Sequence, residues 1–130
     1  MSNLCVAGET QAPPRVVVVG LASCFGCQLQ ITNAEAHLLE VLGQIDMRYW
    51  QLTSSEPMPD KFDVAVIEGA VTTREGMETV QRVREKAAKV IAIGSCATTA
   101  GIPGMAQPDF ESRITEVYED APSACGEIVS

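Results

Sequence analysis

The chain has 130 residues, of which 46% are hydrophobic, and carries a formal net charge of −8. This length suits one domain, and the apolar content argues against disorder. Seventeen acidic residues outnumber the nine lysine and arginine residues, so we expect no basic surface that could neutralise nucleic-acid phosphates. The longest apolar stretch, residues 16–22, is far shorter than the roughly 20 residues of a membrane-spanning helix. We expect neither nucleic-acid binding nor direct membrane insertion.

The N-terminal segment, residues 1–14, is polar, contains prolines and has no periodicity, so we expect a flexible leader before one domain at 15–130. Residues 15–24 imitate the lipid-attachment box of bacterial lipoproteins, but no basic region precedes them. Five cysteines, two of them three positions apart, favour metal or redox chemistry in a reducing compartment over structural disulfides. We therefore predict a cytoplasmic protein. Cys5 has no neighbouring residue of a ligand type.

The first half of the domain predicts a strand, a helix and a second strand. Residues 15–20 are a continuous β-branched run, typical of a strand buried on both faces of a parallel sheet. Residues 28–42 have helical spacing, and Gly43 ends that helix. The alternation of residues 45–52 suits an edge strand, and the prolines of 54–60 indicate a loop.

The second half repeats this order. Thr72 and Glu75 have capping-box spacing and predict a helix with an apolar face. Strands are predicted before and after it, an irregular turn and a weaker helix follow, and the last residues resemble the opening of a fifth strand; in chain order these segments are 62–67, 90–93, 101–104, 110–118 and 127–130. Alternating strands and helices with short loops predict an α/β fold with a doubly wound parallel sheet, incomplete at its C-terminus.

Three cysteines follow predicted strands. Cys24 and Cys27 come after the first strand, and Cys96 comes after the fourth. The carboxyl ends of the strands in a doubly wound sheet meet at one edge, where ligands bind, and helix N-termini there favour anionic sulfur. Three or four thiolates without a nearby histidine favour an iron-sulfur cluster, or secondarily zinc. Gly26 and Gly94 would let the backbone approach a bulky inorganic core.

These residues also allow other interpretations. Cys24 and Cys27 alone would form a dithiol redox pair, because a thioredoxin-type motif also opens a helix after a strand. Cys96 would then be a buried, small apolar side chain. Glu68, after the third strand, either lies beside the cluster or caps a backbone N–H, and His37 is expected on the surface. No glycine-rich dinucleotide fingerprint follows the first strand.

Three motifs occur in a fixed order along residues 15–105. They are Cys-Phe-Gly-Cys at 24–27, Ile-Glu-Gly-Ala at 67–70 and Gly-Ser-Cys-Ala-Thr-Thr-Ala-Gly-Ile-Pro-Gly at 94–104. Together they resemble the small, iron-sulfur subunit of nickel-iron hydrogenases. The cluster-bearing small subunit of respiratory complex I is related, but it has adjacent cysteines, whereas this chain has the hydrogenase spacing.

The resemblance implies a flavodoxin-like domain that carries the proximal 4Fe-4S cluster. Such a subunit relays electrons between the nickel-iron site of a large subunit and further electron-transfer subunits. The family's pattern places Cys24, Cys27 and Cys96 in three ligand positions and Glu68 in the acidic position near the cluster. The lack of a twin-arginine leader resembles the cytoplasmic branch, whose complexes reduce NAD(P), a deazaflavin or a disulfide-linked partner.

The fourth ligand of the family is missing. It is a cysteine in a Gly-Cys-Pro-Pro turn, and this motif does not occur in the chain. Cys125 is the one downstream candidate, but no proline flanks it. Truncation of the chain would account for the difference, with residues 127–130 opening the strand that leads to the missing cysteine.

Overall fold

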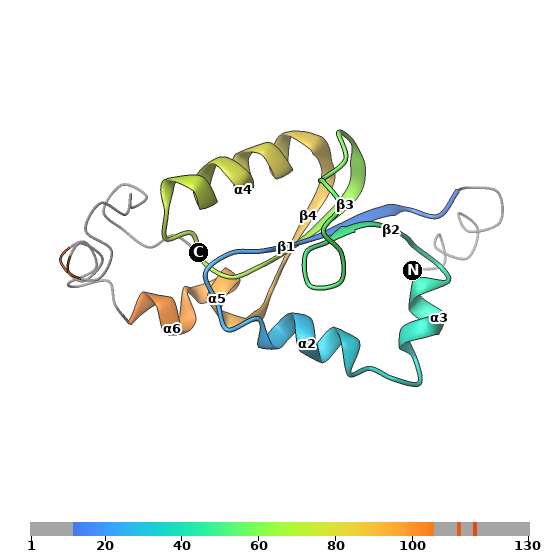
Figure 1. Cartoon of the computed structure of the whole chain (residues 1–130), viewed down its shortest axis with the longest axis horizontal. Helices are drawn as coiled ribbons and strands as arrows, with labels where there is room; N and C mark the ends of the chain where they lie inside the picture. The colour runs from blue at the N-terminus through green and yellow to red at the C-terminus, as the bar shows by residue number, and fades with distance from the viewer. Residues whose placement is uncertain (1–11, 106–111, 113–115, 117–130) are drawn as a thin grey trace.

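The computed structural model describes residues 12–105, 112 and 116 (Figure 1). The predicted leader up to residue 11, Cys125 and the strand opening at 127–130 lie outside the described residues, as does most of the helix predicted at 110–118. Strands and helices alternate along the described chain in the order β1 (Arg15–Gly20), α2 (Gly26–Thr32), α3 (Leu38–Leu42), β2 (Asp46–Trp50), β3 (Phe62–Glu68), α4 (Arg74–Lys86), β4 (Ala87–Ile93), α5 (Gly94–Thr99) and α6 (Gly101–Gly104).

The four strands form one parallel sheet in the order β2-β1-β3-β4. The chain steps from β1 to β2 on one side and from β3 to β4 on the other, so the strand order reverses between β1 and β3. Helix α4 covers one face, while α2 and α5 lie on the opposite face (Figure 1). This arrangement confirms the predicted α/β doubly wound fold, with β2 at an edge of the described sheet.

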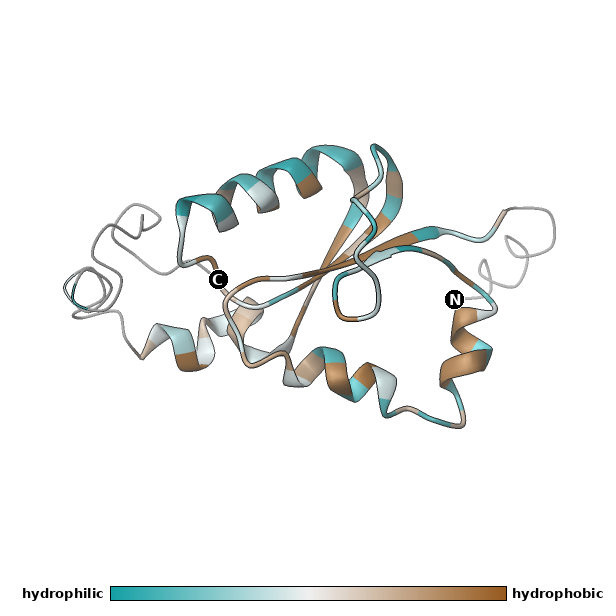
Figure 2. Cartoon of the chain, viewed as in Figure 1, coloured by the Kyte–Doolittle hydropathy of each residue, from teal (hydrophilic) through white to brown (hydrophobic). Residues whose placement is uncertain are grey.

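The main core lies between the sheet and α4. Its buried members are Val17, Val19, Phe62, Ala65, Ile67, Val83 and Ala87. Figure 2 shows hydrophobic residues (brown) along the strands in the middle of the molecule and many hydrophilic residues (teal) along α4. Burying each of the larger side chains contributes about 1.5–3 kcal/mol, so the β-branched runs that predicted the strands also hold the sheet against α4.

The predicted helix at 28–42 is wrong in its continuity, because two helices occupy this range. Helix α2 ends at Thr32 and α3 begins at Leu38. Glu35 between them has a φ of 29°, which a continuing right-handed helix does not allow. Val41, one of the apolar residues whose spacing suggested one helix, is 52% exposed, so the apolar face of that predicted helix does not lie against the core throughout.

Two predicted boundaries also differ from the structure. The hydroxyl of Thr73, rather than that of Thr72, caps α4 by accepting a hydrogen bond of 3.1 Å from the N–H of Gly76. The irregular turn predicted at 101–104 is the single helical turn α6, closed by the N–H of Gly104 donating to Ala100 O over 2.8 Å. Ala100 has a φ of 63°, so it separates α6 from α5.

Candidate metal centre

The turns after β1 and β3 are locked together. The N–H of Leu21 donates to Glu68 O over 2.8 Å, and Ala22 and Ala70 exchange two backbone hydrogen bonds of 3.0 and 3.1 Å. Gly69 has a φ of 104°, and a Cβ atom there would lie 2.8 Å from the backbone of Leu21. Only glycine fits this crossing, so the two turns form one rigid edge of the sheet.

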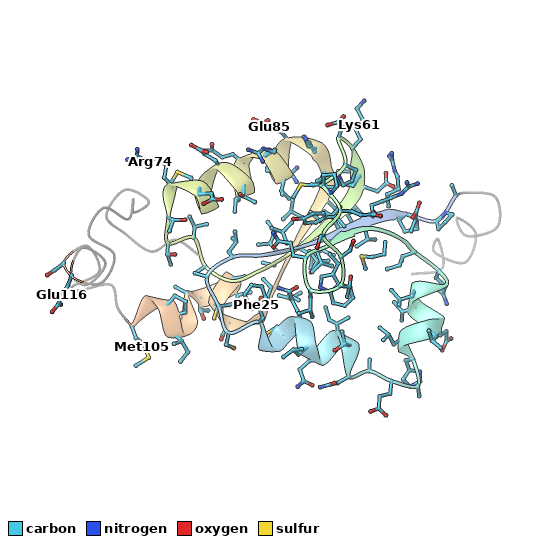
Figure 3. All side chains as sticks on the ribbon, in the orientation of Figure 1. Phe25, Lys61, Arg74, Glu85, Met105 and Glu116 are labelled. Carbon is cyan, nitrogen blue, oxygen red and sulfur yellow. The ribbon has the colours of Figure 1, made fainter. Side chains whose placement is uncertain are left out.

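The loop that carries the first two cysteines is anchored by Phe25, between them in sequence. Phe25 adopts a left-handed backbone with a φ of 62°, and its N–H donates to the hydroxyl of Ser23 over 3.1 Å. A Cβ atom on Gly20 would collide with the Phe25 ring, so the ring occupies the space that the glycine leaves open. Figure 3 shows Phe25 at the turn into α2. Cys24 is therefore exposed on the loop, and Cys27 is half-buried in the first turn of α2.

Cys96 lies in the first turn of α5, half-buried, directly after β4. The turn into α5 contacts the other cysteine motif. Gly94 has a φ of 79°, and a Cβ atom on it would lie 2.5 Å from the Sγ of Cys27. The end of β4 and the start of α2 thus approach each other at a glycine.

Cys24 and Cys96 share a pocket of about 360 Å³. Small and apolar residues complete its lining, namely Ala22, Ser23, Ile102 and Pro103. The predicted convergence is therefore present, because Cys24 and Cys96 line one pocket while Cys27 touches the turn that leads into Cys96. None of these three thiols is in a disulfide.

The donors do not close on a single ion. Within residues 12–105, 112 and 116, no group of three or more histidine, cysteine, aspartate or glutamate side chains could hold one metal ion. A tetrahedral zinc site would need its ligands gathered around one point, whereas a cluster is held by thiolates that stand around a larger inorganic core. Cys24 and Cys96, which line one pocket, and Cys27 beside the turn into α5 are therefore compatible with the second arrangement and not with the first.

Glu68 lies at the same edge and is paired with a side chain. It is 2% exposed, and its Oε2 accepts a hydrogen bond of 3.0 Å from Nε2 of Gln28. Oε1 of Gln28 accepts in turn from the indole N–H of Trp50 over 2.9 Å. Sequence reasoning missed Gln28 and Trp50. The available signal was that Gln28 precedes the apolar Ile31 by three positions, which places a polar side chain on the buried face of the helix.

His37 lies away from the cysteines on the surface. It is exposed, with Nδ1 3.7 Å from an oxygen of Glu40, as expected of a surface histidine. In the part of the chain that the structure describes, every helix is too short or too polar to cross a membrane.

Comparison with protein families gives a match over residues 24–125 to the NADH ubiquinone oxidoreductase 20 Kd subunit. The chain belongs to this family. The matched range begins at Cys24 and includes all three motifs on which the resemblance rests. That resemblance, to a group containing hydrogenase and complex I small subunits, is confirmed.

Curated relatives are hydrogenase subunits. The chain is 27% identical over 120 residues to the NAD-reducing hydrogenase HoxS subunit delta of Cupriavidus necator, covering 92% of this chain and 57% of the relative. It is 34% identical over 108 residues to a subunit of the F420-non-reducing hydrogenase of Methanothermobacter marburgensis, covering 80% of this chain and 35% of the relative. The chain thus spans about half or less of these relatives.

A solved structure confirms the fold. A chain in the crystal structure of an NAD+-reducing [NiFe]-hydrogenase in the H2-reduced state superposes with a TM-score of 0.79 at 23% identity. The match covers 91% of this chain and 75% of that chain. The fold of this chain is therefore one already observed in a solved hydrogenase structure.

Proposed function

We propose that the chain is an electron-transfer subunit of a nickel-iron hydrogenase and carries a 4Fe-4S cluster in the proximal position. Cys24, Cys27 and Cys96 would hold three of its irons. The observation that carries the proposal is that Cys24 and Cys96 line one apolar pocket and Cys27 packs against the turn at Gly94 that leads to Cys96, in a chain whose curated relatives are hydrogenase subunits.

The cluster would supply one-electron chemistry, and the chain would supply its ligands and surroundings. Thiolates are the usual ligands of such clusters. Ala22, Ile102 and Pro103 line the pocket and would keep water from the sulfurs, and the hydrophobic shell and solvent exposure of a cluster help to set its reduction potential.

A large subunit that bears the nickel-iron site is the proposed partner at this edge. Ile102, which lines the pocket, and Met105, at the end of α6, are 75% and 77% exposed, and large exposed apolar side chains favour a covering partner. Electrons would pass onward to further redox subunits. We also propose that the complex reduces NAD(P), a deazaflavin or a disulfide-linked partner. Its proposed location is the cytoplasm.

The fourth ligand is either Cys125 or a residue that the chain does not contain. Replacing Cys125 by Ser distinguishes the two, because it lowers the iron content only if Cys125 is a ligand.

Iron binding tests the proposal directly. The chain would be purified anaerobically with its large subunit, and iron and acid-labile sulfide would be measured in Cys24→Ser, Cys27→Ser and Cys96→Ser variants. Each substitution is expected to remove the cluster or shift its potential. Cys5→Ser is the matched control and should leave the iron content unchanged. Iron bound equally by all four variants, with an unchanged cluster potential, would refute the ligand assignment.

A dithiol-disulfide oxidoreductase or redox sensor that uses Cys24 and Cys27 is the second candidate. Exposure of Cys24 favours it, because thiol-disulfide exchange needs an accessible attacking sulfur. This function predicts a reversible Cys24–Cys27 disulfide, seen by mass spectrometry, and no dependence on Cys96. A requirement for Cys96 would exclude it.

A further inference from the structure

Three buried side chains form a hydrogen-bonded chain behind the cysteine loop. The indole N–H of Trp50 donates to Oε1 of Gln28 over 2.9 Å, and Nε2 of Gln28 donates to Oε2 of Glu68 over 3.0 Å. These side chains belong to residues that are 4%, 0% and 2% exposed, respectively. Buried polar groups are costly unless they are paired, so each of the three holds its neighbour in one position.

The orientation of the Gln28 amide is fixed by the hydrogen-bonding groups of its two neighbours. An indole N–H can only donate, so the amide oxygen of Gln28 must face Trp50 and its amino group must face Glu68. This removes the usual ambiguity in the orientation of a glutamine amide. Methionine in place of Gln28 would fill the same space but form neither hydrogen bond. Glutamate in its place would put a second acceptor beside the acceptor oxygen of Glu68.

The hydrogen bonds among Trp50, Gln28 and Glu68 tie the start of α2 to the sheet. Trp50 is the last residue of β2, Glu68 is the last residue of β3, and Gln28 directly follows Cys27. Gly20 at the end of β1 makes room for the amide, since a Cβ atom there would lie 2.7 Å from Nε2 of Gln28. The amide therefore occupies a slot at the carboxyl ends of three adjacent strands.

We propose that Gln28 is a positioning residue for Cys27. Through Trp50 and Glu68 it fixes the first turn of α2 against the sheet, and so sets the direction and exposure of the Cys27 thiol before any metal binds. That Cys27 is positioned as a cluster ligand rests on the proposed function. That Gln28 positions Cys27 does not depend on it.

The test measures the Cys27 thiol in the metal-free full chain. Iodoacetamide alkylation of each cysteine would be followed by mass spectrometry in Gln28→Met and Trp50→Phe variants. Gln30→Met is the matched control, because Gln30 is an exposed glutamine on the same helix. Loss of a buried hydrogen bond should raise the rate at Cys27 by roughly fivefold in Gln28→Met and by somewhat less in Trp50→Phe. The rate at Cys96 in the same molecules, and that at Cys27 in Gln30→Met, should stay at the wild-type value.

A wild-type rate at Cys27 in both Gln28→Met and Trp50→Phe would overturn the proposal. If Gln28→Met does not fold, as judged by far-UV circular dichroism, Trp50→Phe and Glu68→Gln decide. Glu68→Gln keeps an acceptor for Nε2 of Gln28 and should leave the rate unchanged, while Trp50→Phe raises it; equal rates in these two variants would contradict the positioning role.

Failure of the proposed function gives a different result. Wild-type protein that binds no iron after reconstitution with iron and sulfide would refute the cluster. The alkylation rates would still decide whether Gln28 positions Cys27.

Discussion

Gly94 lies directly on the thiol of Cys27, so closely that a Cβ atom at residue 94 would be 2.5 Å from Sγ. The two residues follow β4 and β1, which are separated in the sheet by β3. Glycine is needed there for space and for its φ of 79°. The two cysteine motifs therefore meet across an intervening strand because residue 94 has no side chain.

Replacing Gly94 by Ala should destabilise the protein and disturb the candidate metal centre. The new methyl group would overlap Sγ of Cys27, and alanine disfavours the left-handed backbone. We expect a loss of about 2 kcal/mol in the free energy of unfolding, measured by urea denaturation of the metal-free protein, together with a lower iron content after reconstitution.

Gly76→Ala is the matched control for this substitution. Its nearest contact for a Cβ atom is 3.4 Å, and it lies inside α4, where alanine is favoured over glycine by roughly 1 kcal/mol. It should be neutral or stabilising. A Gly94→Ala protein as stable as Gly76→Ala would contradict the close packing at Cys27.

Thr73→Ala should destabilise α4 by about 1 kcal/mol, the usual effect of losing an N-cap side chain. The hydroxyl of Thr73 accepts from the N–H of Gly76 at 3.1 Å, and alanine would leave that N–H without its partner. Thr72→Ala, at the position that the sequence pattern favoured, should change the free energy of unfolding much less. Thermal or urea unfolding of the two variants measures the difference, and a larger effect at Thr72 would refute the assigned cap.

Asp63 should make the stability of the protein depend on acidity. The side chain and backbone N–H of Arg15 donate hydrogen bonds to its carboxylate, and they hold the pKa of Asp63 below its ordinary value of 3.8. The deprotonated form is therefore favoured in the folded state. Its contribution to stability is present above the ordinary pKa and is lost as the pH falls through the lowered one.

Urea unfolding of wild type and Asp63→Asn across the acid range measures this effect. The difference in unfolding free energy between the two should be constant from about pH 5 upward and shrink at lower pH. Asp60→Asn is the control, because Asp60 is exposed and its contact with Nζ of Lys86 is long, at 3.6 Å. A difference for Asp63→Asn that does not change with pH would show that the Arg15 contact is not retained in solution.

The strands and the meeting of the cysteines could be predicted because their signals are local. The run of four valines from Val16 to Val19 is readable as a buried parallel strand, and a cysteine directly after such a strand must lie at the carboxyl edge of the sheet. The same reasoning placed Glu68 at that edge. Its burial and its partner could not be read from these patterns.

The missed features depend on contacts between distant segments. Gln28 has an ordinary helical position in sequence, and only the folding of β2 and β3 around it brings Trp50 and Glu68 within hydrogen-bonding distance. The break between α2 and α3 was missed for a related reason, since the apolar spacing continues through it although the backbone at Glu35 does not. Periodicity reports which residues are apolar but not which of them the tertiary structure buries.

We propose that Cys24, Cys27 and Cys96 hold an iron-sulfur cluster that exchanges electrons with a hydrogenase large subunit. Electron paramagnetic resonance of the anaerobically purified complex, recorded before and after exposure to hydrogen, tests it most directly. We predict about four irons per chain, as a 4Fe-4S cluster requires, and a signal of a reduced cluster that appears under hydrogen and is lost or altered in Cys96→Ser. A colourless, iron-free chain, or a signal unaffected by all three cysteine substitutions, would contradict the account.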